Sequence, residues 1–266
     1  HIAPFHHVTL NNLSTPALLI EQSRLRENLA AMQKTADAND VTLRPHVKTH
    51  KSAAIAKRQQ QRGAEGLTVA TVKEAETFVE AGFSDVRVAY PVTGRDKHER
   101  LQALRDEATI SFTVDTAAGA EQASAVYAEA GAPVDVLMEV DVGHGRCGVH
   151  WSDDEAAVTL ARHVASLLGL RLAGLLTHAG QAYHGPSGNE TENEALRRVA
   201  QHERDRMLSV AAALADADGP GATPDAFEIS VGSTPTMAAF KNAERAGCGV
   251  TEIRPGNYVM HDAMQV

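Results

Sequence analysis

The sequence predicts an α/β protein whose strands close into a (β/α)8 barrel of the TIM type. Short runs of β-forming residues alternate with Ala-rich, charged segments of helical character, which is the order of βα units around a parallel sheet. Eight such runs occur in 266 residues, and a closed barrel of eight parallel strands needs roughly 250. An open doubly wound sheet is the alternative, and it fits eight strands with intervening helices less well.

The strand candidates are short and are separated by segments of helical length. In chain order they cover residues 43–47, 67–70, 86–90, 110–114, 134–140, 170–176, 227–231 and 250–254. Helices are expected at residues 52–62, 72–81, 96–107, 117–130, 153–168 and 190–215, where apolar residues recur at helical spacing. The last two βα units are less regular than the others.

One barrel domain is expected over residues 16–266, preceded by an N-terminal tail at residues 1–15. The stretch 216–224 is expected to be a loop before the seventh strand, because a boundary there leaves about 45 residues, too few for an independent core. An extra apolar run at residues 16–20 precedes the first barrel strand. We expect it to pair with a segment outside the barrel.

Composition and charge exclude several classes of function. The chain has 25 basic and 34 acidic residues, a net charge of -9, and no dense basic run, so nucleic acid is not an expected partner. No apolar stretch approaches the roughly 20 residues that span a bilayer, so we expect no membrane contact and a cytoplasmic location. Cys147 and Cys248 lack the spacing of a disulfide framework or zinc site and are expected to be reduced thiols. His1, His6 and His7 are expected to belong to a solvated tail.

Chemistry in such barrels is expected at the carboxyl ends of the strands. The first strand runs into RPHVKTHK, which places Lys48 at the strand end, pointing into the barrel mouth. A buried lysine with a lowered pKa can act as a nucleophile and form a Schiff base, whereas an ordinary loop lysine stays protonated and solvated. Lys51 is the competing candidate, but it lies at the start of the next helix, where we expect it to face solvent.

The loops after the seventh and eighth strands have the character of a phosphate site. The seventh is followed by VGSTPT and the eighth by RPGNY. Backbone amides and hydroxyls in such turns bind phosphate, and many barrels hold a phosphate between these two loops. Each turn taken alone is also an ordinary capped turn.

Polar, glycine-containing loops also follow the fifth and sixth strands, at residues 139–148 and 177–184. Without further context, Asp141 is a hydrogen-bond acceptor at the start of its loop. His178 is then a strand-end histidine with a satisfied partner.

Together these segments resemble the alanine-racemase-like (fold type III) family of pyridoxal-phosphate enzymes, most closely its D-serine dehydratase and D-threonine aldolase branch. The segment RPHVKTHK is the branch signature. STPALLI, DVGHGRCGV, LTHAGQAYH, ISVGSTPT and TEIRPGNYVMHD support it in the family's order and spacing over nearly the whole chain.

The resemblance implies a role for each matching residue. Lys48 carries pyridoxal 5'-phosphate and serves as the base that removes the Cα proton. His178 packs at the ring face, Arg146 lies near the substrate carboxylate or the ring hydroxyl, and either Arg254 or Tyr183 holds the ring nitrogen. The phosphate rests on Gly232, Ser233, Thr234, Gly256 and Asn257.

Relatives continue into a β-rich second domain, for which this sequence has no residues after Val266, so the resemblance implies a barrel without that domain. In the dehydratase and aldolase branch, that domain supplies the ligands of a divalent metal, Zn or Mn, which engages the substrate β-hydroxyl. A metal is therefore expected only where the second domain is supplied. Relatives often form dimers, and a homodimer is one expectation.

The implied function is a pyridoxal-phosphate-dependent lyase acting on a small D-amino acid. It eliminates water from a D-serine-like substrate or cleaves a D-β-hydroxy amino acid by a retro-aldol reaction, and THAGQAY favours the dehydratase. An amino-acid racemase is an alternative, which needs a second base, usually a tyrosine from the partner subunit. A non-catalytic protein that binds pyridoxal phosphate and a barrel without cofactor are the others.

Overall fold

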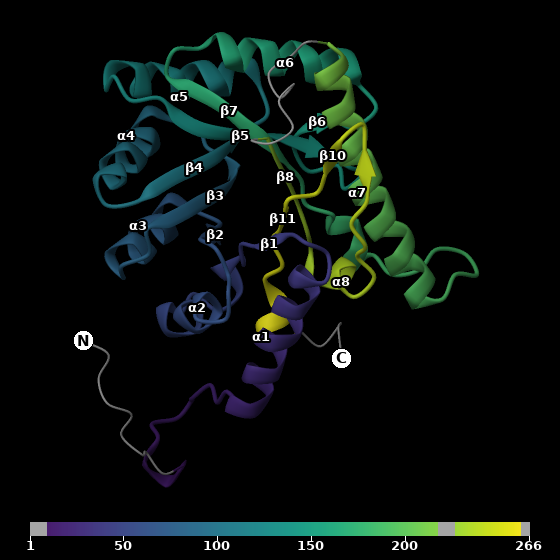
Figure 1. Ribbon diagram of the computed structural model, residues 1–266. Helices are drawn as coiled ribbons and strands as arrows, with labels where there is room; N and C mark the ends of the chain where they lie inside the picture. The colour runs from purple at the N-terminus through teal and green to yellow at the C-terminus, as the bar shows by residue number, and fades with distance from the viewer. Residues whose placement is uncertain (1–9, 218–226, 262–266) are drawn as a thin grey trace.

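The computed structural model describes residues 10–217 and 227–261. Eight parallel strands form one sheet in the order β1-β11-β8-β7-β5-β4-β3-β2, which curves into a barrel (Figure 1). Each of the eight predicted runs overlaps one of them, so the predicted fold class is confirmed. The strands are β1 (Thr42–Leu43), β2 (Leu67–Val69), β3 (Asp85–Pro91), β4 (Thr109–Val114), β5 (Val134–Asp141), β7 (Leu170–Leu176), β8 (Glu228–Val231) and β11 (Glu252–Ile253).

The barrel closes between the first and last strands of this order. The Thr68 amide donates to the Pro45 carbonyl at 2.9 Å, and the Glu65 amide donates to the Leu43 carbonyl at 2.8 Å. His46 also forms a parallel bridge with Thr68. Closure pairs backbone groups that an open sheet leaves exposed at its edges.

Helices cover the outside of the barrel, and capping side chains set where most of them begin. At five helices, a Ser, Thr or Asp side chain accepts a hydrogen bond from the amide three residues further on, which satisfies a donor that the helix itself leaves free. The predicted starts of these helices are correct to within two residues. The helices between strands are α2 (Ala53–Gln60), α3 (Val72–Glu80), α4 (Arg95–Ala103), α5 (Ala117–Glu129), α6 (Asp154–Ser166), α7 (Glu192–Asp216) and α8 (Thr234–Met237).

The helix α1 (Gln22–Asp37), before β1, was not among the predicted elements. Its buried side chains recur at helical spacing and are Leu25, Leu29, Met32 and Ala36. It packs on β1 and on the 3-10 turn η6 (Asn257–Val259), where Asn28 Nδ2 donates to the Val259 carbonyl at 3.1 Å. Also unpredicted are β6 (Val149–His150), paired with β5, and the hairpin of β9 (Glu244–Arg245) and β10 (Cys248–Gly249).

Other expectations have mixed outcomes. Residues 16–20 are not part of a strand, and Leu18 and Leu19 are 83% and 62% exposed, so pairing of this run with a further segment stays a prediction. The tail histidines and most of the 216–224 loop lie outside the described residues. Both cysteines are unpaired. Within the described parts of the chain, no helix is long and apolar enough to cross a membrane.

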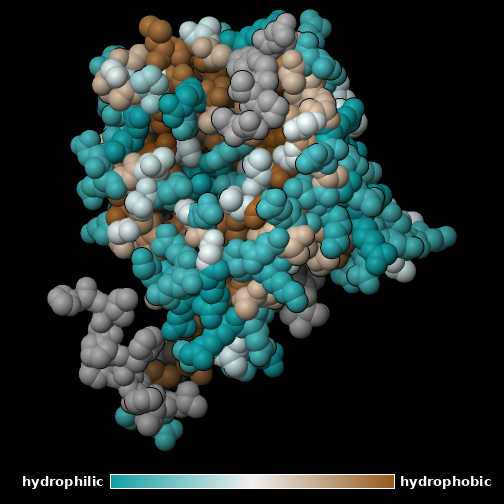
Figure 2. Space-filling model, viewed as in Figure 1, coloured by the Kyte–Doolittle hydropathy of each residue, from teal (hydrophilic) through white to brown (hydrophobic). Residues whose placement is uncertain are grey.

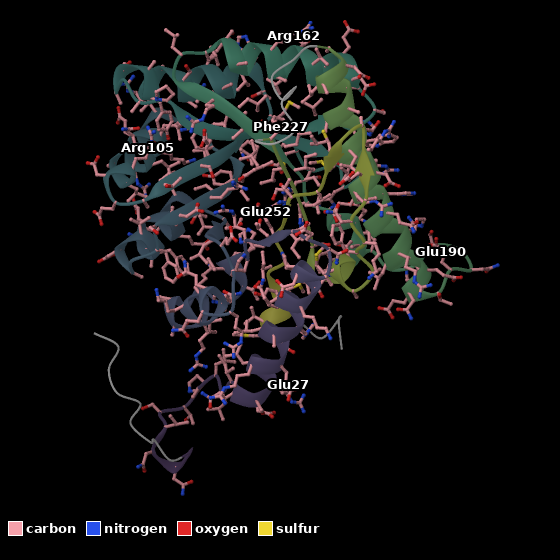
Figure 3. All side chains as sticks on the ribbon, viewed as in Figure 1. Glu27, Arg105, Arg162, Glu190, Phe227 and Glu252 are labelled. Carbon is pink, nitrogen blue, oxygen red and sulfur yellow. The ribbon has the colours of Figure 1, made fainter. Side chains whose placement is uncertain are left out.

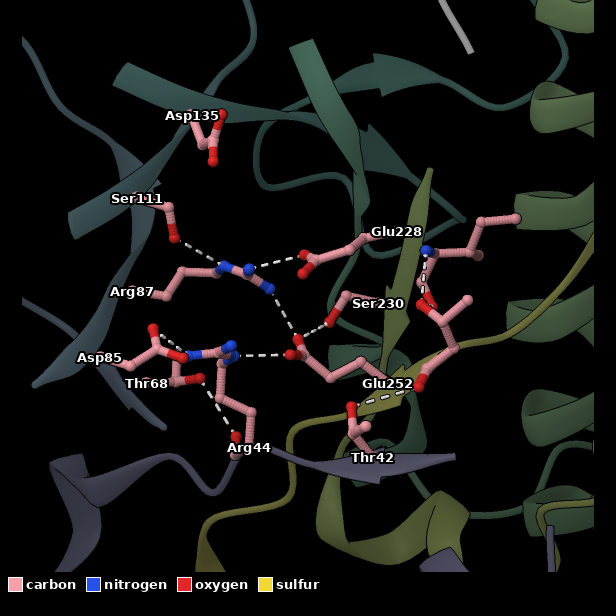
Figure 4. Close-up of polar contacts among 12 residues, drawn as sticks. Thr42, Arg44, Thr68, Asp85, Arg87, Ser111, Asp135, Glu228, Ser230 and Glu252 are labelled. Carbon is pink, nitrogen blue, oxygen red and sulfur yellow. Dashed lines mark hydrogen bonds and ion pairs between the residues drawn. The ribbon is translucent and has the colours of Figure 1, made fainter. Parts of the chain in front are cut away.

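An ion network fills the amino-terminal end of the barrel. Arg44 Nε lies 2.5 Å and Arg87 Nη1 lies 2.7 Å from the carboxylate of Glu252, which lies in the middle of the molecule (Figures 3 and 4). Arg44 also contacts Asp85, and Arg87 also contacts Glu228. Burial favours the neutral form of Glu252, but the two guanidinium groups outweigh it and lower its pKa to about 2.

The outer surface of the barrel is mostly polar. Figure 2 shows a face that is mainly hydrophilic, as expected where helices turn their apolar stripes toward the barrel.

Candidate functional site

A cavity of about 240 Å³ opens at the carboxyl ends of the strands. It is somewhat smaller than the roughly 300 Å³ at which typical ligand pockets begin, so it suits a small ligand. Every residue predicted for the site lines it: Lys48, Arg146, His178, Tyr183, Gly232, Ser233, Thr234, Arg254, Gly256 and Asn257. The structure thus brings these residues together, while the role of each in binding stays a prediction.

A larger cavity of about 800 Å³ lies near the amino ends of the strands, beside Thr42, Glu65 and Thr251. Barrel enzymes place their chemistry at the opposite end, where loops rather than packed side chains terminate the strands. We therefore take the smaller cavity as the candidate site.

The charge of the small cavity sets it apart from the rest of the protein. Its lining includes Lys48, Arg146 and Arg254 but, among the described residues, no Asp or Glu. The chain as a whole carries a net charge of -9. A cationic cavity in an acidic protein favours an anionic ligand such as a phosphate or a carboxylate.

Lys48 follows β1 within the 3-10 turn η2 (Val47–Thr49), which begins at His46. Its side chain lines the cavity and is exposed to solvent there. Desolvation by the neighbouring protein atoms, followed by the charges of Arg146 and Arg254, lowers the Lys48 pKa, and the charge of Glu74 opposes the shift. A larger share of unprotonated amine makes Lys48 a better nucleophile.

Lys51 lies outside the cavity. Its side chain is 66% exposed, and its Nζ lies 3.0 Å from Oε1 of Glu74. Of the two lysines weighed from the sequence, only Lys48 lines the cavity.

The turn after β8 and the turn after β11 bring backbone close to the cavity because two positions lack a side chain. A Cβ on Gly232, whose φ is +130°, would lie 2.9 Å from the Arg254 nitrogen. A Cβ on Gly256 would lie 2.9 Å from the His46 carbonyl oxygen. Glycine at both positions therefore lets the two turns and the Lys48 segment pack tightly.

The hydroxyl and amide groups of these turns are held by each other. Thr49 Oγ1 donates to Asn257 Oδ1 at 2.8 Å, and the Tyr258 amide donates to Thr234 Oγ1 at 3.1 Å. The Gly232 amide donates to Glu203 at 2.9 Å, away from the cavity. Gly232 therefore contributes shape to the predicted phosphate site, whereas Ser233, Thr234 and Asn257 offer side-chain hydrogen-bonding groups.

His178 presents a neutral ring to the cavity. Burial, followed by the charges of Lys48 and Arg146, lowers its pKa to about 3. Its Nδ1 lies 3.4 Å from the Gly232 carbonyl, so this nitrogen carries the proton. His144 packs against it edge to face, with ring centroids 6.0 Å apart.

Arg254 is buried and fixed by the barrel. Its guanidinium donates to Ser230 Oγ and to the Thr177 carbonyl. Burial lowers its pKa to about 10, although Glu252 opposes the shift. Arg146, in contrast, is about half exposed and lies 3.1 Å from Glu139. Arg254 is thus a buried cation of the cavity, and Arg146 is a more exposed one.

Asp141 fixes the loop that carries Arg146. Its Oδ1 accepts hydrogen bonds from the amides of Gly143, His144 and Gly145 at 2.8, 2.9 and 3.0 Å. Asp141 is therefore the loop-start acceptor that its position in the sequence predicts.

Sequence reasoning missed several residues of the site. His46 and Thr49 line the cavity on either side of Lys48. Glu203, on α7, is fully buried and binds the turn after β8. A glutamate on the apolar face of α7, between Val199 and Met207, was the available signal.

Comparison with known proteins agrees with this geometry. The family model for the alanine racemase N-terminal domain matches residues 20–263. The D-threo-3-hydroxyaspartate dehydratase of Delftia sp. (strain HT23) is 38% identical over 254 residues, which are 96% of this chain and 63% of that protein. The D-threonine aldolase of an Arthrobacter species is 39% identical over 254 residues, 95% of this chain and 62% of that protein.

Solved structures give the same result. The Delftia dehydratase superposes with a TM-score of 0.84 at 37% identity, over 95% of this chain and 62% of that chain. The D-threonine aldolase of Filomicrobium marinum superposes with a TM-score of 0.80 at 32% identity, over 96% and 65%. This chain spans less than two thirds of the length of these relatives. On sequence, fold and site geometry, the chain belongs to the alanine racemase N-terminal domain family, whose members use pyridoxal phosphate.

Proposed function

We propose that this chain is the cofactor-binding barrel of a pyridoxal-phosphate-dependent lyase that acts on a small D-β-hydroxy amino acid. The observation that carries the proposal is the cationic cavity in which Lys48 faces hydroxyl-bearing turns, with no carboxylate among its described lining residues. Dehydratase and aldolase relatives near 38% identity support a lyase. A racemase is the alternative, and products distinguish the two.

The residues present fit this cofactor. Gly232 and Gly256 let the two turns pack closely at the edge of the cavity, and Ser233, Thr234 and Asn257 supply polar groups for a phosphate. Lys48 would hold the cofactor covalently. When bound, pyridoxal phosphate withdraws electrons from the Cα of an attached amino acid.

Side chains of the cavity would bind the substrate and move its proton. When the Lys48 amine is not bound to the cofactor, its lowered pKa lets it act as the base that takes the proton from the substrate Cα. Arg146, the more exposed cation, would bind the substrate carboxylate as a charge-assisted pair. His178, whose pKa is lowered to about 3, would pack as a neutral ring against the cofactor. Arg254 and Tyr183 both line the cavity, and either would reach the ring nitrogen.

A divalent metal, Zn or Mn, belongs to this proposal only if ligands come from beyond the described residues. Within residues 10–217 and 227–261, no three His, Cys, Asp or Glu side chains gather as a metal site. Small D-amino acids are the proposed substrates, and a homodimer is the proposed assembly.

The first test is chemical trapping of the cofactor. The purified protein is incubated with pyridoxal phosphate, reduced with borohydride and mapped by peptide mass spectrometry. We expect a reduced adduct on Lys48, which is lost in Lys48→Ala and retained in Lys51→Ala. An adduct on Lys51, or none on either lysine, would contradict the cofactor assignment.

Products then identify the reaction. Incubation with D-serine, D-threonine and D-threo-3-hydroxyaspartate is expected to yield a keto acid with ammonia from a dehydratase, or glycine with an aldehyde or keto acid from an aldolase. Formation of the L-enantiomer instead would establish a racemase. The loss of Lys48 as the base is expected to lower the rate by about 10² to 10⁴.

A further inference from the structure

Glu203 is a carboxyl group with no exposed surface, carried by α7. Its Oε1 accepts from the Gly232 amide at 2.9 Å, and its Oε2 accepts from Thr236 Oγ1 at 3.2 Å. It also accepts from the Ala179 amide. A buried carboxyl is costly unless it is hydrogen-bonded, so these contacts account for its retention in an apolar helix face.

These contacts join two loops that line the cavity. Gly232 lies in the turn between β8 and α8, Thr236 lies in the short helix α8 that follows, and Ala179 directly follows His178 after β7. Gly232 in turn offers its carbonyl to His178 Nδ1 at 3.4 Å. One carboxyl of α7, which packs against α8 and η4 (Gly180–Tyr183), therefore holds both loops from behind (Figure 1).

Inside the turn, the same contacts orient hydroxyl groups. Thr236 Oγ1 lies 3.1 Å from Ser233 Oγ and accepts from the Ser233 amide at 3.4 Å. Because Glu203 fixes Thr236, it also limits the positions open to Ser233, a lining residue of the cavity. Residues 232–236 carry much of the polar surface expected to meet a phosphate.

We propose that Glu203 is a positioning residue that holds the turn 232–236 in the shape that binds the phosphate group of the cofactor. That the phosphate belongs to pyridoxal phosphate rests on the proposed function. The hydrogen bonds that Glu203 accepts from the amides of Gly232 and Ala179 and from Thr236, which we call the clamp, can be tested without any ligand. Glu203 does not line the cavity, so its effect reaches the ligand only through the turn.

The test compares pyridoxal 5'-phosphate with pyridoxal, which lacks the phosphate. Dissociation constants are measured by spectral titration for the wild type, Glu203→Leu, Glu203→Gln and Thr236→Val. The titrations are made at pH 8, where Glu203 is ionised. The preference for the phosphorylated ligand is then expected to fall by at least about tenfold in Glu203→Leu, since hydrogen bonds to a charged group are worth at least about a factor of ten. Glutamine keeps an acceptor for the Gly232 amide, so Glu203→Gln is expected to retain most of the preference.

A matched control is Leu214→Ala. Leu214 lies on the same buried face of α7, three turns away, and is 1% exposed. This variant is expected to lower the melting temperature without changing the ligand preference. Equal preference in Glu203→Leu and the wild type would overturn the proposal. If Glu203→Leu does not fold, Thr236→Val is the deciding variant. It is expected to lose less of the preference for the phosphorylated ligand, and an unchanged preference would overturn the proposal.

Hydrogen–deuterium exchange tests the clamp without any ligand. Faster exchange of the amides at 179 and 232 is expected in Glu203→Leu and not in Leu214→Ala, and unchanged exchange would overturn the clamp. A wild type that exchanges as expected but binds neither ligand would refute the proposed function alone. The two failures are therefore distinguishable.

Discussion

At the scale of single residues, burial rather than residue type decides what the polar side chains of the site can do. Lys48 and His178 lose part of their affinity for protons because protein atoms and neighbouring cations surround them. Lys51, three residues from Lys48, lies outside the cavity, and its Nζ pairs with Glu74. The two lysines of one short segment thus face different surroundings.

Glu203 gives a pH-dependent prediction at this scale. Burial raises its pKa from 4.5 to about 7, although the Gly232 amide and Arg254 oppose the shift. A carboxyl whose pKa is raised by folding contributes most stability below pH 4.5 and loses it as the pH rises to about 7. Glu203→Gln does not titrate, so its stability relative to the wild type is expected to rise by on the order of 3 kcal/mol across this window.

Urea denaturation at several pH values measures this difference. Leu214→Ala is a suitable control, because its difference from the wild type should not vary with pH. A constant difference between Glu203→Gln and the wild type from pH 4.5 to 7 would mean that Glu203 does not titrate there.

At the scale of elements, helix α7 is the support of the site. Its N-cap is Thr191, and the side chains of Thr191 and Glu194 each accept a hydrogen bond from the other residue's backbone amide. Such a reciprocal cap satisfies two donors that the helix leaves free. The first turn of α7 lies three turns before Glu203, so the cap also stabilises the helix that carries the clamp.

Removal of this cap is expected to weaken the helix. Thr191→Ala should lower the free energy of unfolding by about 1 kcal/mol, as is usual for a lost N-cap. Thr159→Ala, at an exposed position inside α6, is the control and should stabilise slightly, by about 0.5 kcal/mol, because Ala favours the helix more than Thr. Equal unfolding midpoints for both variants in urea would show that the cap contributes little.

At the scale of the whole molecule, the two ends of the barrel have opposite tasks. The amino-terminal end is filled by Arg44, Arg87 and Glu252, whereas the carboxyl end holds the cavity. Ser230 connects them, because it contacts both Glu252 and Arg254 (Figure 4 shows its contact with Glu252). The ion network therefore supports Arg254 in the cavity.

Breaking this network is expected to be costly. Glu252→Gln leaves two buried guanidinium groups short of one counter-charge, and loss of one partner of a buried pair typically costs about 3 to 5 kcal/mol. In the wild type, the lowered pKa of Glu252 means that its stabilisation is present above pH 4.5 and lost as the pH falls toward 2. In urea denaturation, the free energy of unfolding of Glu252→Gln should depend less on pH than that of the wild type. Glu27→Gln, on the exposed face of α1, should show the same pH dependence as the wild type.

Much of the fold was predictable because its signals are local. The eight strands and the capped helices each follow from composition and spacing within a few residues, and the site motifs follow directly after strands. Helix α1 was missed although its apolar residues recur at helical spacing, and β6, β9 and β10 are too short to produce a pattern.

The sequence by itself determined the order of the βα units and which loops carry polar residues. Tertiary structure alone decided that β1 meets β2, that Lys48 rather than Lys51 reaches the cavity, and that Glu203 lies behind the turn at Gly232. The backbone and side-chain contacts among these join positions 22 and 29 residues apart, and the choice between the two lysines depends on which side chain faces the cavity. Local periodicity contains no information on such pairings, because they are set by closure of the barrel and by the cost of leaving buried polar groups unpaired.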